Sequence, residues 1–264
     1  MPLTRDQMQA ASDLLCRTWS EGGVLTALPE AIRPATRAEG YAIQALIERH
    51  TSEPLFGWKI AATSLAGQRH INVDGPIAGR LLAERVIANG AAHSLTGNRM
   101  RVAEPELAFR MARDQPPRAA PYTLDEVMSA VGALHLAIEI PDSRYENYAG
   151  AGAPQLIADD ACAHWFLLGL EAPPAWRGID LAAHRVTAAV AGKPPLEGSG
   201  ANVLGDPRVA LAWLANELSS LGIVLRAGEV VTTGTLVTPL PIAPGDRVSA
   251  DFGSLGTVTV HFTP

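Results

Sequence analysis

The chain has 264 residues, of which 47% are hydrophobic and 18% charged, and its formal net charge is −6. A chain of this length can bury a large core, and a negative balance without any basic run argues against nucleic acid and anionic membranes as partners. No uncharged apolar segment approaches the ~18 residues of a membrane span, and residues 1–15 carry charges where a signal peptide would be apolar. Because Cys16 and Cys162 are too few for a disulfide framework or a zinc cluster, we predict a cytoplasmic protein.

Two helices are predicted in the N-terminal part of the chain. The first covers residues 4–19, because apolar side chains recur there at helical spacing, at Met8, Ala11, Leu15 and Trp19. The second follows Thr36, which forms a capping box with Glu39. We interpret residues 1–54 as a small helical cap or arm and residues 55–264 as a β-rich domain.

Beyond these helices the pattern changes to short β segments punctuated by Gly and Pro. The first strand is predicted at residues 56–61, where Gly57, Lys59 and Ala61 share one face. Further strands are predicted at 79–82, 100–110, 133–140, 163–168, 184–191, 229–233, 246–251 and 255–262.

Two more helices interrupt the strands. Thr123 and Glu126 cap a short one, and residues 207–221 form the clearest helix, with Asp206 as N-cap and Gly222 just past its end. Sparse helices among many short strands predict an α+β fold instead of alternating βαβ units.

Three glutamates lie in apolar segments. Residues two apart on a strand face the same way, so Glu104 and Glu106 project together, and Glu139 lies between Ile138 and Ile140. Carboxylates that converge in a poorly solvated place repel one another, and a hard divalent cation such as Mg²⁺ or Mn²⁺ relieves that repulsion. The alternative is two solvated strand carboxylates and an unrelated, ion-paired Glu139.

Pro105 separates the first two glutamates and cannot donate a hydrogen bond to a neighbouring strand. We therefore expect this strand to lie at a sheet edge or to contain a bulge, where a metal and a substrate could approach.

Lysine is rare in this chain. Of the 21 basic residues only Lys59 and Lys193 are lysines, which favours a chemical role for a lysine that is kept. Lys59 is interpreted either as a surface residue or as a partner of the carboxylates. Burial would lower its pKa and nearby carboxylates would raise it.

Several short motifs follow one another from about residue 36 to the end of the chain. They are Gly57-Trp58-Lys59-Ile60, Ala103-Glu104-Pro105-Glu106-Leu107-Ala108-Phe109, Ala137-Ile138-Glu139-Ile140 with Ser143-Arg144, Ala158-Asp159-Asp160-Ala161, Gly198-Ser199-Gly200-Ala201 with Leu204-Gly205-Asp206-Pro207, Thr233-Gly234-Thr235, and Pro244-Gly245-Asp246 with Gly253-Ser254-Leu255-Gly256. Together they resemble the 2-keto-4-pentenoate hydratase family of the fumarylacetoacetate hydrolase superfamily, which also includes the 4-oxalocrotonate decarboxylases.

The resemblance implies a fold and a set of site residues. The fold would be a mixed β-sandwich or roll of the fumarylacetoacetate hydrolase type with a small N-terminal helical region, commonly assembled as a homo-oligomer. The metal ligands would be Glu104, Glu106 and Glu139. Lys59 and Asp159 would be catalytic, and the substrate would be held by Ser199, Gly200, Thr233, Gly234 and Ile77.

The chain departs from the family pattern in two places. Asp160 stands where Asn is usual, and Ile77-Ala78 falls where many hydratases have Pro-Asp, an acid close to the reacting diene. An apolar Ile77 would favour an alkyl or aryl substrate tail.

By resemblance, the implied reaction is metal-dependent addition of water to a 2-hydroxy-2,4-dienoate, giving a 4-hydroxy-2-oxo acid in the catabolism of aromatic compounds. The alternatives within the family are a 2-oxo acid decarboxylase of the 4-oxalocrotonate type and an acylpyruvate C–C hydrolase. From a different class, the chain could be a catalytically altered scaffold of the same fold.

Overall fold

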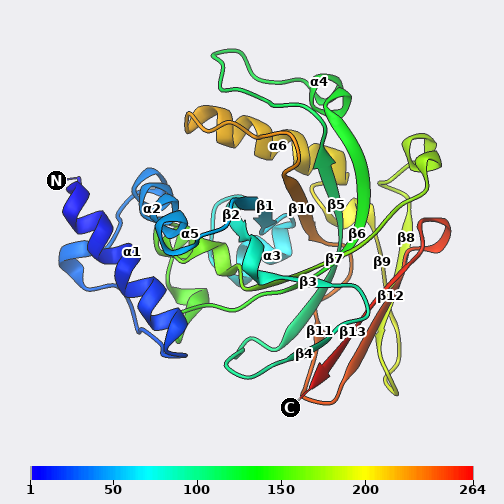
Figure 1. The fold of residues 1–264 in the computed structure, drawn as a ribbon, viewed down its shortest axis with the longest axis horizontal. Coiled ribbons are helices and arrows are strands. Elements are labelled where there is room, and N and C mark those ends of the chain that lie inside the picture. The colour runs from blue at the N-terminus through cyan, green and yellow to red at the C-terminus, as the bar shows by residue number, and fades with distance from the viewer. Residues whose placement is uncertain (1, 264) are drawn as a thin grey trace.

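A computed structural model describes residues 2–263, which form two β-sheets and a set of peripheral helices (Figure 1). The helices are α1 (Arg5–Ser20), α2 (Arg37–Gln44), α3 (Leu65–His70), α4 (Leu124–Ser129), α5 (Ala153–Ala158) and α6 (Pro207–Ser220). The strands are β1 (Leu55–Ala61), β2 (Ile77–Leu82), β3 (Val86–Ala88), β4 (Ala92–Ser94), β5 (Val102–Met111), β6 (Val131–Ile140), β7 (Trp165–Glu171), β8 (Arg185–Val190), β9 (Leu196–Ser199), β10 (Val230–Thr235), β11 (Leu240–Pro241), β12 (Arg247–Asp251) and β13 (Thr257–Thr263).

The predicted helix starts are confirmed at their caps. Thr36 and Thr123 each form a capping box with the glutamate three residues on, and the Asp206 side chain accepts a hydrogen bond from Arg208 N–H. Each cap satisfies N–H groups that the first turn of a helix leaves without partners. The prediction that residues 4–19 form a helix is also confirmed, with Thr4 as the N-cap of α1.

The large sheet has the order β2-β1-β10-β5-β6-β7-β3, with β11 paired to β5. It is rolled: the rings of Phe56 on β1 and Phe166 on β7 lie 6.3 Å apart, although three strands separate β1 from β7 in the sheet. Both rings belong to a small apolar cluster that also contains Leu81 and Val230, from β2 and β10. One face of the sheet therefore closes upon itself.

The second sheet, β4-β13-β12-β8-β9, packs against the first through β13, which contacts β6 and β7. Its strands alternate buried and more exposed residues, as a sheet with one covered face requires. Val258, Val260 and Phe262 point into a large core that is shared with the outer face of the rolled sheet. The predicted α+β class with mixed sheets is confirmed.

Pro105 lies in the interior of the large sheet, so the prediction of a sheet edge is wrong: β5 pairs with β6 on one side and with β10 and β11 on the other. The predicted alternative, a bulge, is present between Thr232 and Thr235, where β10 has two residues opposite one of β5. The Pro105 carbonyl accepts from Leu236 N–H (2.9 Å), so the proline nitrogen also faces this irregular stretch. A regular ladder bond is not required there.

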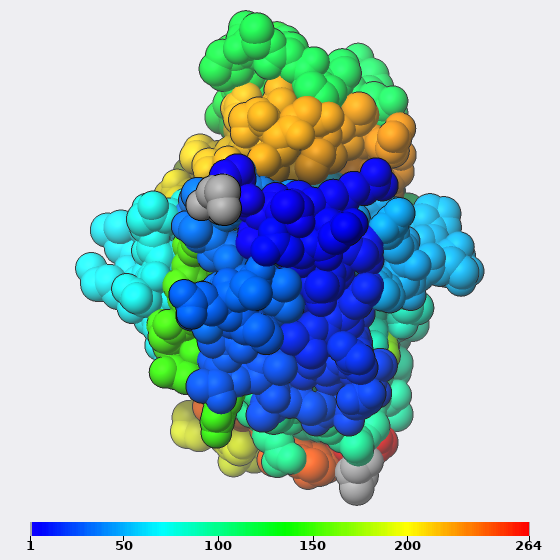
Figure 2. Space-filling view, turned by 90° about the vertical axis from the view of Figure 1, so that its left-hand side faces the viewer, coloured from blue at the N-terminus to red at the C-terminus, as the bar shows by residue number. Residues whose placement is uncertain are grey.

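The N-terminal helices cover one side of the molecule, where α1 and α2 spread over the surface that Figure 2 shows in blue. Their apolar residues Ala11, Leu15 and Ile43 belong to the same buried cluster as the sheets. The division into residues 1–54 and 55–264 stays a prediction. Among residues 2–263, no helix is both long and apolar enough to span a membrane.

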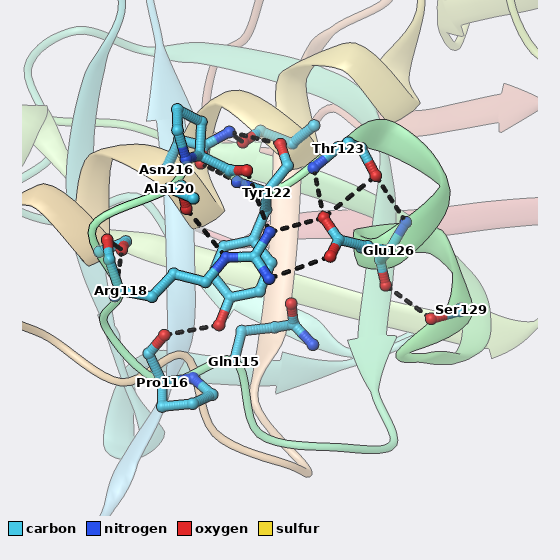
Figure 3. Close-up of polar contacts among 12 residues, drawn as sticks. Gln115, Pro116, Arg118, Ala120, Tyr122, Thr123, Glu126, Ser129 and Asn216 are labelled. Carbon is cyan, nitrogen blue, oxygen red and sulfur yellow. Dashed lines mark hydrogen bonds and ion pairs between the residues drawn. The ribbon is translucent and has the colours of Figure 1, made fainter.

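The segment 112–123 connects β5 to α4 and lies against α6, held by polar contacts (Figure 3). Arg118 pairs with Glu126 (2.6 Å), lies 3.7 Å from the ring centroid of Tyr122, and donates to backbone carbonyls of its own segment. Asn216 of α6 exchanges hydrogen bonds with the backbone of Tyr122. Arg118 therefore stabilises the exposed segment 112–123.

We predict that Gly57→Ala strongly destabilises the fold. A Cβ at Gly57 would lie 1.9 Å from the carbonyl oxygen of Val230, a backbone atom of the paired strand β10 that cannot rotate away. Overpacking of this kind costs about 1–3 kcal/mol or more of unfolding free energy, which urea denaturation measures. Gly75→Ala is the matched control, because a Cβ there meets nothing within 4 Å. Equal stability of the two variants would contradict the packing.

Candidate metal centre and active site

The inner face of the rolled sheet carries the predicted site residues. The strand pairing places Lys59 of β1, Thr232 of β10, and Glu104 and Glu106 of β5 with Glu139 of β6 on this one face. Lys59 Nζ lies 3.0 Å from Glu139 Oε1, although β10 and β5 separate their strands. A flat sheet would keep these two backbones about 14 Å apart, so the ion pair depends on the roll.

The three glutamates are gathered as predicted. Glu104, Glu106 and Glu139 each offer a carboxylate oxygen, and these oxygens lie within 4.8 Å of one another. Glu104 and Glu139 are directly opposite each other in the β5–β6 pair. Glu106 lies two residues further along β5, opposite Ala137 and on the same face. Glu106 and Glu139 are fully buried, whereas Glu104 keeps part of its surface exposed. Glu104 therefore lies on the more open side of the cluster.

Glu106 is oriented by the bulge of β10. One carboxylate oxygen, Oε2, accepts hydrogen bonds from the Thr232 hydroxyl and from Gly234 N–H (2.8 Å). The other, Oε1, is buried and has no hydrogen-bond partner among the described residues. A buried carboxylate oxygen without a donor is costly, and a cation beside it removes that cost. The donor set of three carboxylates therefore fits a hard divalent metal.

Burial raises the pKa of all three carboxyl groups, and repulsion between carboxylates adds to this for Glu104 and Glu106. For Glu104, burial and then the charge of Glu139 raise the pKa to about 7, while Lys59 partly offsets them. For Glu106, burial and the charges of Glu139 and Glu104 raise the pKa well above its usual value. The pKa of Glu139 is raised by burial despite its ion pair with Lys59. Without a metal, the cluster therefore retains protons that a solvated glutamate would release.

Lys59 is a partner of the carboxylates and is not a surface lysine, since its side chain is 4% exposed. Its ammonium group donates to the carbonyl oxygen of Ala161 (2.8 Å) and pairs with Glu139. Burial lowers the pKa of Lys59, but Glu139, Cys162 and Glu104 together raise it above its ordinary value. Attraction therefore exceeds desolvation, the balance that the sequence leaves open.

Asp159 is placed beside the site without facing the carboxylate cluster. Its side chain is fully buried, accepts from the Ser143 hydroxyl (2.6 Å) and forms an ion pair with Arg144. The neighbouring Asp160 accepts from Arg80 N–H (2.6 Å). These bonds hold the turn that presents Ala161 to the lysine, and a direct catalytic role of Asp159 stays a prediction.

The predicted substrate-binding residues fall into three groups, on β10, at the end of β9 and on β2. Gly234 touches the centre through its bond to Glu106 and has φ +104°, where a Cβ would lie 2.1 Å from Thr63 Oγ1. The hydroxyl of Thr233 is buried and donates a hydrogen bond to the carbonyl oxygen of Leu107 (2.9 Å).

Ser199 and Gly200 lie where β9 ends. The segment that follows them is connected to the residues just after β10, because Asn202 Nδ2 donates a hydrogen bond to Leu236 O (2.7 Å). A Cβ on Gly200 would lie 1.9 Å from the Leu181 carbonyl, so this glycine is required for packing. Binding roles for both residues stay predictions.

Ile77 begins β2, opposite Ala61 and two residues from Gly79, the partner of Lys59. Alternation puts it on the lysine's face of the sheet, and it is fully buried. At the start of β2, the face of the sheet that carries Lys59 therefore has an apolar side chain.

Sequence reasoning missed three residues near the centre. Thr232 orients Glu106, and only its place before Thr233-Gly234 hints at this. His70 of α3 and Tyr148 meet with Nε2 3.3 Å from the phenol oxygen. Burial, followed by the charges of Cys162 and Glu104, raises the pKa of Tyr148, which places its ring near the carboxylates. No motif marks this pair, because its two residues lie far apart in the sequence.

Residues 60–263 match the family model described as fumarylacetoacetate (FAA) hydrolase C-terminal. The chain belongs to this family. It is 34% identical over 226 residues to a 2-keto-4-pentenoate hydratase of Burkholderia vietnamiensis, covering 84% of this chain and 85% of the relative. It is 35% identical over 216 residues to a 2-hydroxyhexa-2,4-dienoate hydratase of Comamonas testosteroni, covering 81% and 80%.

Solved structures of the family share the whole fold. The 4-oxalocrotonate decarboxylase from Pseudomonas putida G7, complexed with magnesium and adipate, superposes with a TM-score of 0.90 at 27% identity over 98% of both chains. The same enzyme complexed with calcium and acetate gives 0.88 at 26% identity, again over 98% of both chains. The family resemblance and fold predicted from the sequence are confirmed.

We predict that Mg²⁺ or Mn²⁺ raises the thermal melting temperature and that Glu106→Gln removes most of this shift. A ligand that binds only the folded state at 100 times its Kd stabilises it by about 2.7 kcal/mol. Glu197→Gln, which changes a carboxylate of an exposed ion pair on β9, is the control and should keep the full shift. An unchanged melting temperature at millimolar metal would refute the centre.

The metal-free protein should lose stability as the pH rises from about 5 to 7.5. Because the pKa of Glu104 is raised from 4.5 to about 7, the folded state holds a proton that the unfolded chain releases over this range. Melting in a chelator should show the decline, and Glu104→Gln should reduce it. Since protons and metal compete for the same oxygens, the metal-induced shift should grow from pH 6 to pH 8. A shift independent of pH would contradict this coupling.

Proposed function

We propose that this protein is a divalent-metal-dependent hydratase that adds water to a 2-hydroxy-2,4-dienoate and gives a 4-hydroxy-2-oxo acid in the catabolism of aromatic compounds. The observation that carries the proposal is the buried cluster of Glu104, Glu106 and Glu139 with Lys59 ion-paired to it. The hydratases of Burkholderia vietnamiensis and Comamonas testosteroni, similar over most of the chain, support the reaction type.

Glu104, Glu106 and Glu139 would hold the metal, for which we propose Mg²⁺ or Mn²⁺, and the magnesium in the similar decarboxylase structure supports this choice. When bound, the ion supplies Lewis-acid polarisation of a 2-oxo acid and charge stabilisation for the enolate that develops from it. Thr232 and Gly234 fix the direction of Glu106, because both donate to the same carboxylate oxygen. Such neighbours fix the orientation of a metal ligand and thereby tune the affinity of the site.

Lys59 would hold a proton at Nζ beside the substrate. The raised pKa of Lys59 keeps the amine protonated at neutral pH. The ammonium group would first stabilise negative charge on the substrate and would then donate its proton. Its ion pair with Glu139 favours the protonated form, so the amine regains a proton once it has donated one. An ammonium group in a dry site stabilises developing charge more strongly than it would in water.

Substrate carboxylate binding would fall to the Ser199–Gly200 and Thr233–Gly234 loops, which meet through the bond from Asn202 to Leu236. Ile77 supports an apolar substrate tail, since it is an uncharged side chain on the lysine's face. A homo-oligomeric assembly and a cytoplasmic location stay predictions.

The second candidate is a 2-oxo acid decarboxylase of the 4-oxalocrotonate type. The close superposition on the Pseudomonas putida decarboxylase favours it, because the same enolate would form when CO₂ leaves. An acylpyruvate C–C hydrolase and a scaffold without activity are weaker alternatives. A scaffold has no need for three mutually repelling carboxylates.

Activity assays with purified protein and Mg²⁺ separate these candidates. We expect 2-hydroxypenta-2,4-dienoate to lose its dienol absorbance without CO₂ release, whereas CO₂ from 4-oxalocrotonate would establish the decarboxylase. Glu106→Gln should lower kcat/KM by about 10²-fold or more and Lys59→Met by about 10²–10⁴-fold, with Glu197→Gln unchanged. Full activity of Glu106→Gln would overturn the assignment of the centre.

A further inference from the structure

The turn 159–162, between α5 and β7, has an unusual backbone. Three consecutive residues with side chains adopt positive φ: Asp160 (55°), Ala161 (51°) and Cys162 (61°). Each is unfavourable for a residue with a side chain, because the Cβ crowds the backbone in this region. Such a turn persists only where its surroundings hold it, and strained backbone of this kind concentrates at functional sites.

The turn directs one carbonyl at the lysine. The carbonyl oxygen of Ala161 accepts a hydrogen bond from Lys59 Nζ (2.8 Å). Among the hydrogen bonds and ion pairs of the described residues, Ala161 and Glu139 are the only partners of that ammonium group. Gly79 allows the approach, since a Cβ there would lie 2.4 Å from Asp160 O and 3.0 Å from the Lys59 side chain. Displacing the turn would therefore displace the amine.

Arg144 holds both ends of the turn. Its guanidinium donates to the carbonyl oxygen of Asp159, the first residue of the turn, and to that of Ala163 just after it (2.9 Å), and it pairs with the Asp159 carboxylate. The arginine is 4% exposed, and Ser143 donates to the other oxygen of the same carboxylate (2.6 Å). No other side chain among the described residues hydrogen-bonds to backbone on both sides of the turn.

The N-terminal helix covers this arginine. The Arg144 guanidinium lies 4.4 Å from the ring centroid of Trp19, at the end of α1. The guanidinium of Arg85 lies 4.5 Å from the centroid of the same ring and 4.6 Å from that of Trp165 on β7. At these distances the positive guanidinium is attracted to the electron-rich face of the ring. Continuous contacts therefore run from α1 through Arg144 and the turn to Lys59.

We propose that Arg144 is a positioning residue for Lys59: by holding both ends of the turn 159–162, it sets the place of the Ala161 carbonyl and hence of the lysine amine. The proposal rests on the proposed function, in which Lys59 acts beside the substrate. In it, Asp159 and Trp19 serve the same end, one by pairing with Arg144 and the other by covering it.

Only an arginine can make these contacts together. The planar guanidinium carries five N–H donors in a fixed fork, and here it reaches Asp159, its backbone carbonyl and Ala163 at once. Arg144→Lys keeps the charge that Asp159 requires but cannot hold both ends of the turn. This variant therefore tests position separately from charge.

The test is a double-mutant cycle in kcat. Arg144→Lys should lower kcat by about 10–100-fold, as small misplacements of a catalytic group do, with metal affinity unchanged. In the Lys59→Met background the same substitution should change the residual kcat by less than about 2-fold, because the group it positions is gone. Equal losses in both backgrounds would overturn the proposal.

Arg118→Lys is the matched control. Arg118 also donates to backbone carbonyls, pairs with a carboxylate and stacks on an aromatic ring, but it serves the exposed segment 112–123 (Figure 3). Its substitution should leave kcat unchanged in both backgrounds. If Arg144→Lys does not fold, Trp19→Leu takes its place. A loss that disappears with Lys59→Met would again support the proposal, and a loss that remains would refute it.

A second measurement needs no substrate. With only two lysines, the protein labelled with ¹³C at lysine Cε gives two NMR signals, and that of exposed Lys193 is the internal reference. Arg144→Lys should move the Lys59 signal and leave Lys193 in place, the added lysine being identified in the variant that also carries Lys59→Met. An unmoved Lys59 signal would refute the proposal, whereas wild-type protein inactive on both substrates would refute the proposed function alone.

Discussion

The structure depends on keeping three carboxylates and one ammonium group in a place with little water. Glu106, Glu139 and Lys59 are buried inside a rolled sheet, where an unpaired charge costs several kcal/mol. Burial raises the pKa values of the three glutamates, and they stay raised even beside Lys59, because one lysine does not offset the loss of water around three carboxylates. A divalent cation would supply the missing positive charge, so the arrangement that destabilises the metal-free protein would favour metal binding. The roll makes this possible because it turns one face of a sheet into an interior.

Several exceptions to regular backbone surround that interior. The bulge of β10 at Thr233–Gly234 turns an N–H toward Glu106, and the turn 159–162 gives a carbonyl to Lys59. Close backbone approaches at Gly57 and Gly79 allow neighbouring segments to come near enough. Elsewhere the chain follows ordinary rules, with capped helices and alternating strands. Around the charged groups, this irregular backbone determines the direction of polar atoms.

The N-terminal helices have a different relation to the site. They contribute no residue to the carboxylate cluster among the described residues, yet Trp19 of α1 packs on Arg144, which holds the turn behind Lys59. Their apolar faces belong to the main core. The description of residues 1–54 as a cap is thus incomplete, since this segment also supports the back of the site.

Much of this protein was determined by local sequence alone. Capping boxes at Thr36 and Thr123, the N-cap Asp206, the main strands and the common face of Glu104 and Glu106 follow from short-range stereochemistry, which needs no knowledge of the fold. The motif order around Lys59 and Glu139 identified the family, and it also predicted the metal ligands. Only the tertiary structure decided that β5 is interior, that Lys59 keeps a raised pKa, and that Arg144 holds the turn behind it. These properties arise between strands and loops that are distant in sequence, where the curvature of the sheet, the loss of water and the contacts of one side chain with several segments act together.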